Sequence, residues 1–107
     1  MNKEYKLRYL PLFYEDVREK ISYIRDELQN PSAADNLIDA VEEAILKRLP
    51  VCESFEPYHS SRKREYPYYR IYVKNYIVFY VVIDDGNSKI MEVRRFLYNK
   101  QDRDNIV

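Results

Sequence analysis

Hydrophobic positions near the start of the chain change from a period of two to a helical period. Tyr5, Leu7 and Tyr9 alternate with polar residues, which predicts a short β-strand over residues 5–9. From Pro11 to about Gln29 the apolar residues recur every three or four positions, which predicts an amphipathic helix. The apolar stripe consists of Leu10, Phe13, Val17, Ile21, Ile24 and Leu28.

A second helical stripe follows Asn30 and Pro31, which end the first helix. This stripe consists of Ala34, Leu37, Ile38, Val41, Ile45 and Leu49. Ser32 suits the N-cap, Asp35 suits the position of a capping-box carboxylate, and the helix is expected to end near Pro50. Because the connection between the two helices is short, we expect them to pack as an antiparallel hairpin.

The second half of the chain returns to a period of two and predicts three strands. These cover residues 68–74, residues 76–83, which are apolar on both sides as in a central strand, and residues 90–97. The connections are short, so the strands are expected to form an antiparallel meander. The whole chain, residues 1–107, therefore predicts a single α+β domain. Its N-terminal strand is followed by an antiparallel helical hairpin packed on one face of an antiparallel sheet, in the order β-α-α-β-β-β.

Alternation along these strands assigns side chains to two sheet faces. Those that suit the helix-covered face are Ile71, Val73, Met91, Val93 and Leu97. The other face is expected to be open, because little chain is left to cover it. Its expected side chains are Arg70, Tyr72, Lys74 and Arg94. Further cations come from the preceding loop and the tail: Arg62, Lys63, Arg64 and Arg103.

The charge distribution is two-sided although the net charge is zero. Residues 1–57 carry 8 basic and 12 acidic side chains, whereas residues 58–107 carry 10 basic and 6 acidic ones. Cations interleaved with tyrosines suit single-stranded RNA, since the cations hold phosphates and the rings stack on bases. The alternative is an ordinary solvated face whose charges pair with Glu65 and Glu92.

Several other classes of protein are disfavoured. The single glycine excludes Rossmann and P-loop phosphate sites, so no cofactor is expected. Cys52 is the only cysteine, and neither a disulfide nor a metal site is expected, because no third ligand stands near Cys52 and His59. The longest apolar run is far shorter than a membrane span, and the N-terminus has no apolar signal segment. These features predict a cytoplasmic protein.

Four segments together resemble the RelE/ParE superfamily of toxins from bacterial type II toxin–antitoxin systems. They read, in chain order, LRYLPLFYEDV, NPSAADNLIDAVEEAI, YYRIYVKNYIVFYVVID and RFLYNKQD. The resemblance covers nearly the whole chain. It implies a cognate antitoxin that wraps and neutralises the toxin, and one of two targets. RelE-like members cut mRNA on the ribosome, and ParE-like members inhibit DNA gyrase.

The resemblance also assigns candidate catalytic residues for RNA cleavage. Arg70 falls where RelE-like toxins carry a basic residue, and Lys100 keeps a basic residue after the last strand. Tyr98 replaces a frequent histidine, and Ile77 replaces a phosphate-stabilising arginine. Cleavage needs proton transfer and charge stabilisation. Arg70 and Lys100 would stabilise charge, and Tyr98 or His59 would relay protons.

Three hypotheses follow for the function. The first is a ribosome-associated mRNA endonuclease neutralised by an antitoxin. The second is a gyrase inhibitor without nuclease chemistry, favoured by the missing arginine at position 77 and the long helical hairpin. The third is a degenerate member that only binds its antitoxin, which the neutral overall charge favours.

Overall fold

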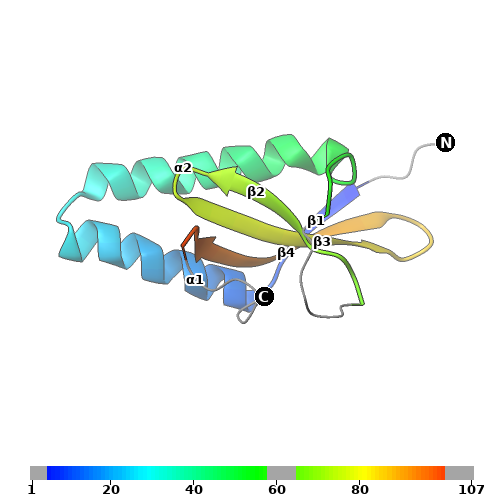
Figure 1. Cartoon of the computed structure of the whole chain (residues 1–107), viewed down its shortest axis with the longest axis horizontal. Coiled ribbons are helices and arrows are strands. Elements are labelled where there is room, and N and C mark those ends of the chain that lie inside the picture. Colours follow the sequence, from blue (N-terminus) through cyan, green and yellow to red (C-terminus); the bar gives the residue numbers. More distant parts are fainter. Residues whose placement is uncertain (1–4, 58–64, 101–107) are drawn as a thin grey trace.

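The computed structural model describes residues 5–57 and 65–100. Its strands are β1 (Tyr5–Tyr9), β2 (Tyr69–Val73), β3 (Tyr76–Asp84) and β4 (Lys89–Tyr98). Its helices are α1 (Pro11–Ser22), a π-helix (Tyr23–Glu27), α2 (Pro31–Arg48) and a 3₁₀-helix (Leu49–Val51). The order confirms the predicted β-α-α-β-β-β arrangement. Figure 1 shows the two helices running antiparallel beside the strands and joined at one end, with the β3–β4 hairpin projecting at the other end.

The four strands form one sheet in the order β1-β4-β3-β2. Strands β2, β3 and β4 pair antiparallel, which confirms the predicted meander. Strand β1 pairs parallel to β4, so the sheet is mixed and not wholly antiparallel. The sequence does not predict whether β1 runs parallel or antiparallel to β4. The two strands are not joined by a hairpin, and parallel and antiparallel pairs show the same period of two.

The helical hairpin differs from its prediction at the connection. The first helix ends as a π-helix, in which the N–H of Leu28 donates to the carbonyl of Tyr23 at 3.1 Å. The N-cap of α2 is Asn30 and not Ser32: its Oδ1 accepts from the N–H of Ala33 at 3.1 Å. Pro31 occupies the first turn, where it loses no hydrogen bond. Neither helix is long and apolar enough to cross a membrane, over the residues described.

The main core lies between the helices and one face of the sheet. Phe13, Leu37 and Ile45 bring the two apolar stripes together over the sheet, and each is at most 4 % exposed. The sheet contributes Ile71, Val73, Val78, Tyr80, Met91, Val93 and Phe96. Burial on this scale, at roughly 25 cal/mol per Å² of apolar surface, is what drives the helices onto the sheet.

A β-bulge in β4 changes which side chains face the helices. Tyr80 pairs with Val93 but Phe79 pairs with Arg95, so Arg94 has no partner of its own on β3. The extra residue reverses the alternation, which places Phe96 in the main core and moves Leu97 to the opposite face. The prediction that Leu97 faces the helices was therefore wrong.

Candidate functional site: the open face of the sheet

The sheet face opposite the helices is called the open face below, because neither helix covers it. It is not made of charged side chains alone. A second apolar cluster lies on it, made of Tyr68, Ile77, Phe79, Val81 and Leu97. All but Tyr68 are at most 1 % exposed. Strand β3 contributes side chains to both clusters, which is why it is apolar on both sides. The expectation that this face is exposed and lined by basic side chains was therefore wrong.

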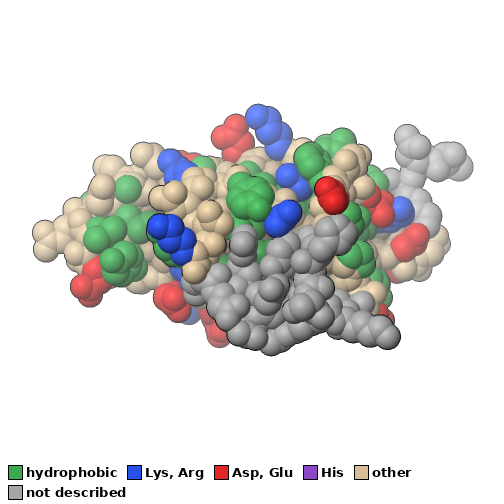
Figure 2. Space-filling view, viewed as in Figure 1, with side chains coloured by type: hydrophobic (Ala, Val, Ile, Leu, Met, Phe, Trp, Pro, Cys, Tyr) green, Lys and Arg blue, Asp and Glu red, His purple; other side chains and the backbone are tan. Residues whose placement is uncertain are grey.

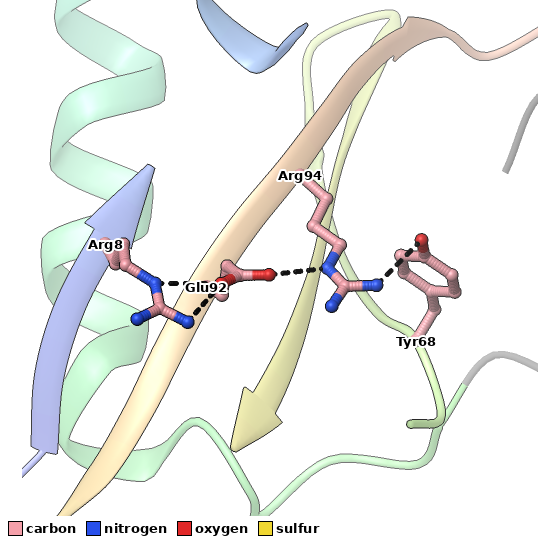
Figure 3. Close-up of polar contacts among 4 residues, drawn as sticks. All are labelled: Arg8, Tyr68, Glu92 and Arg94. Atoms are coloured by element: carbon pink, nitrogen blue, oxygen red, sulfur yellow. Dashed lines mark hydrogen bonds and ion pairs between the residues drawn. The ribbon is translucent and has the colours of Figure 1, made fainter. Parts of the chain in front are cut away.

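A line of polar contacts crosses this face from β1 to the start of β2 (Figure 3). Arg8 on β1 donates from both Nε and Nη2 to Oε2 of Glu92, with the Nε bond at 2.8 Å. Arg94 donates from Nε to the other carboxylate oxygen of Glu92 at 2.8 Å. Its Nη1 lies 3.5 Å from the hydroxyl oxygen of Tyr68. The carboxylate of Glu92 is thus shared by two guanidinium groups.

Burial and pairing set the charges of this network. Glu92 is only 5 % exposed. Burial by itself raises the pKa of Glu92, but the hydrogen bonds from Arg8 and Arg94 outweigh it and hold the pKa below its ordinary value. Burial by itself lowers the pKa of Arg94, but the hydrogen bonds to Tyr68 and Glu92 outweigh it and hold the pKa above its ordinary value. Glu92 is therefore an anion at neutral pH, and its one negative charge is shared between Arg8 and Arg94.

Replacing Glu92 with glutamine is expected to lower the free energy of unfolding at pH 7 by about 2 kcal/mol, because both arginines lose their anion. The folded-state pKa of Glu92 is depressed, so its contribution is complete above the ordinary value of 4.5 and is lost as the pH falls through the folded value. The difference between wild type and Glu92→Gln should therefore shrink below about pH 4.5. Urea unfolding from pH 3 to pH 7 measures both effects. The exposed Glu65→Gln serves as control, and an equal pH dependence in both variants would contradict the assignment.

Arg70 and Tyr72 lie on the open face, as predicted. The guanidinium carbon of Arg70 lies 5.7 Å from the ring centroid of Tyr72. Tyr72 is 57 % exposed and Arg70 is partly buried. Lys74 is exposed in the turn between β2 and β3, where its φ is 54°. Arg94 is also on this face, but it is committed to Glu92 and Tyr68.

Tyr98 lies on the opposite side of the sheet from Arg70. It pairs with Tyr76, and the two rings meet edge to face with centroids 5.7 Å apart. Tyr76 packs against the main core beside Phe96, whereas Arg70 pairs with Phe79 of the open-face cluster. Lys100 is exposed, two residues after β4. The structure therefore does not bring Arg70 and Tyr98 together.

The remaining predicted site residues, His59, Arg62, Lys63, Arg64 and Arg103, lie outside the described residues. In the described part of the view in Figure 2, Lys and Arg side chains are scattered among hydrophobic, acidic and other side chains and do not form one continuous basic patch. Residues 5–57 and 65–100 contain no group of three His, Cys, Asp or Glu side chains that could hold a metal ion.

Comparison with known families gives the decisive finding. A family model described as "ParE toxin of type II toxin-antitoxin system, parDE" matches residues 7–103. The chain belongs to this family of toxins. A search of curated proteins found no match. The match confirms the family indicated by the four sequence segments, and membership in a toxin–antitoxin family implies an antitoxin partner.

Sequence reasoning missed one member of the polar network of this ParE-family toxin, because Arg8 was not singled out. Glu92 was named as a partner for the charges of this face, but as part of an ordinary solvated surface and not as a buried anion. A charged residue flanked by Met91 and Val93 in a buried strand signals a paired anion, since buried charges are stable only with partners. Arg8 gave no comparable signal, because its pairing depends on β1 lying beside β4.

Proposed function

We propose that this ParE-family toxin arrests growth by binding and inhibiting DNA gyrase in the cytoplasm, without nuclease chemistry of its own. One observation carries the proposal: two of the residues predicted to cleave RNA, Arg70 and Tyr98, do not share a face. Arg70 is on the open face and Tyr98 is on the helix side of the sheet. Acid–base catalysis and charge stabilisation require such groups within hydrogen-bond reach of one phosphate.

Two further features support a binding mode of action. Ile77 is 0 % exposed and stands where the ribonucleases of the superfamily carry an arginine, so no cation replaces that group at its position. Arg94 on the open face is already paired with the buried carboxylate of Glu92. A phosphate arriving at this face would compete with a buried carboxylate that Arg94 and Arg8 share.

A ribosome-associated mRNA endonuclease is the second candidate. It is favoured by the pairing of Arg70 with the exposed ring of Tyr72, which suits a phosphate next to a stacked base. In that case, Arg70 would stabilise the phosphate, and the proton transfers would fall to groups outside the described residues or on the ribosome. Under either candidate, a cognate antitoxin is the expected protein partner.

Gyrase inhibition and RNA cleavage are distinguished by two measurements on the full chain. Purified toxin added to gyrase should reduce ATP-dependent supercoiling of relaxed plasmid, and mRNA 5′ ends after induction should show no codon-phased cleavage. Arg70→Ala should leave the supercoiling inhibition unchanged. Normal supercoiling at excess toxin would overturn the gyrase proposal. Codon-phased cleavage that Arg70→Ala abolishes would establish the endonuclease in its place.

A further inference from the structure

A hollow of about 600 Å³ lies on the helix side of the sheet, away from the open face. It is lined by the end of α1 and the π-helix on one side, and by the start of β3 and the end of β4 on the other. The lining side chains used below are Glu19, Lys20, Tyr23, Leu28, Tyr76 and Tyr98. In Figure 1 this is the end of the sheet that points toward the connection between the helices.

Lys20 is a buried cation with little compensation. The residue is 8 % exposed, and its side chain is 10 % exposed. Within the described residues, the Lys20 side chain makes one hydrogen bond, from Nζ to Oε1 of Glu19 at 3.4 Å. The Glu19 side chain is itself 77 % exposed. Neighbouring residues on a helix do not face each other, so this contact is weak. An ammonium group has three donors, and buried charges need close partners, so acceptors are missing here.

Aromatic side chains stand beside this cation. The ring of Tyr76 stacks on Phe96 with centroids 5.0 Å apart, and Tyr98 meets it edge to face. Burial, and then the proximity of Tyr98 and Tyr23, raise the pKa of Tyr76. Its hydroxyl therefore stays protonated and can donate to an anion. The hollow combines a buried cation, a hydroxyl donor and apolar walls.

The backbone at the edge of the hollow is also unusual. Tyr23 and Leu28 are the two ends of a π-helical hydrogen bond of 3.1 Å, and both line the hollow. Both are more than half exposed, at 54 % and 55 %, although they are large and apolar. This turn ends the helix beside the hollow and places two large, exposed side chains at its rim.

We propose that this hollow is a binding site for a protein segment that presents one carboxylate beside an apolar or aromatic side chain, with the carboxylate paired to Lys20. The apolar side chain would contact Tyr23, Leu28 and Tyr98. A nucleic acid fits less well, because Lys20 is the one cation among the described residues that line the hollow, whereas a phosphate backbone is held by several. The site lies on the other side of the sheet from the open face, so it does not depend on whether the target is gyrase.

The test uses N-acetyl-L-phenylalanine as a probe, because it carries one free carboxylate and one aromatic ring. Titration into the isotope-labelled full chain, followed by amide chemical shifts, should move the signals of Lys20, Leu28 and Asn75. The neutral probe N-acetyl-L-phenylalanine amide should bind at least about ten-fold more weakly, and so should the carboxylate probe to Lys20→Met. Lys20→Met keeps the length of the buried stem, so folding is expected to survive. Glu19→Gln removes the competing carboxylate and should strengthen binding.

Lys47→Met, an exposed lysine on α2 outside the hollow, is the matched control and should bind the probe as wild type does. The absence of shifts at the hollow would overturn the proposal. So would equal affinity for the acid and its amide, or wild-type affinity in Lys20→Met. Tighter binding of phenyl phosphate than of N-acetyl-L-phenylalanine would overturn the assignment to a protein carboxylate in favour of a phosphate-bearing ligand.

Discussion

Asp16→Ala is expected to lower the free energy of unfolding by about 3 to 5 kcal/mol, a large part of the stability of a domain of this size. Asp16 on α1 is 6 % exposed. Its carboxylate accepts from Nε and Nη2 of Arg95, at 2.7 and 2.9 Å, and from the N–H of Phe96 at 3.0 Å. Removing it takes a carboxylate and two hydrogen bonds from the partly buried guanidinium of Arg95, and leaves the N–H of Phe96 without this acceptor. Urea unfolding of purified variants measures the loss.

Two matched variants test whether the carboxylate itself is responsible. Glu15→Ala changes an exposed carboxylate on the same helix and should alter the free energy of unfolding by no more than about 0.5 kcal/mol. Asp16→Asn keeps one acceptor oxygen, so its loss should fall between those of Glu15→Ala and Asp16→Ala. A loss below about 1 kcal/mol in Asp16→Ala would show that the bulge in β4 is held by packing alone.

Ile77→Arg is expected to destabilise the fold by a similar amount, about 3 to 5 kcal/mol, and to produce no RNA cleavage. Ile77 is 0 % exposed and lies between Tyr72 on β2 and Leu97 on β4. Both neighbours in the pairing are uncharged, so a guanidinium at this position would be buried between uncharged side chains of β2 and β4. Restoring the residue type of the superfamily's ribonucleases at this one position is therefore not expected to restore their chemistry.

Ile77→Val is the control, because it removes only one methylene and should cost about 1 kcal/mol. Urea unfolding and mapping of mRNA 5′ ends after induction are measured on both variants. A stable Ile77→Arg protein that cuts mRNA at phased codons would contradict both the burial argument and the proposal of a binding toxin.

The sequence predicted the strands and helices well, because burial imposes their periods directly. It did not predict the face of Leu97, since the bulge depends on contacts from a distant element. Asp16 on α1 binds the backbone of Phe96, and Arg94 is left without a partner on β3. Neither the contact with Asp16 nor the bulge at Arg94 can be recognised from the sequence of β4 alone. The N-cap was misassigned for a related reason: Asn30 and Ser32 are both good caps, and Pro31 in the first turn decides between them.

The candidate site was predictable in outline only. Alternation placed Arg70, Tyr72, Glu92 and Arg94 correctly on one face of the sheet. It could not show that Glu92 is a buried anion shared by Arg94 and Arg8, because this depends on the depth of burial and on β1 lying beside β4. It also could not show that Tyr98 lies on the other side, because the bulge reverses the alternation before the strand ends.

The parallel pairing of β1 with β4 has a consequence for the synthesis of the toxin. Arg8 and Glu92 lie 84 positions apart in the sequence, so β1 has none of the described strands to pair with until β4 has been synthesised. Contacts of such long range raise the contact order and slow folding. A nascent or truncated chain that lacks β4 also lacks half of the polar network and the centre of the main core. We therefore expect the sheet to stay incomplete until β4 has been synthesised, so that an antitoxin meets the folded toxin only after that point.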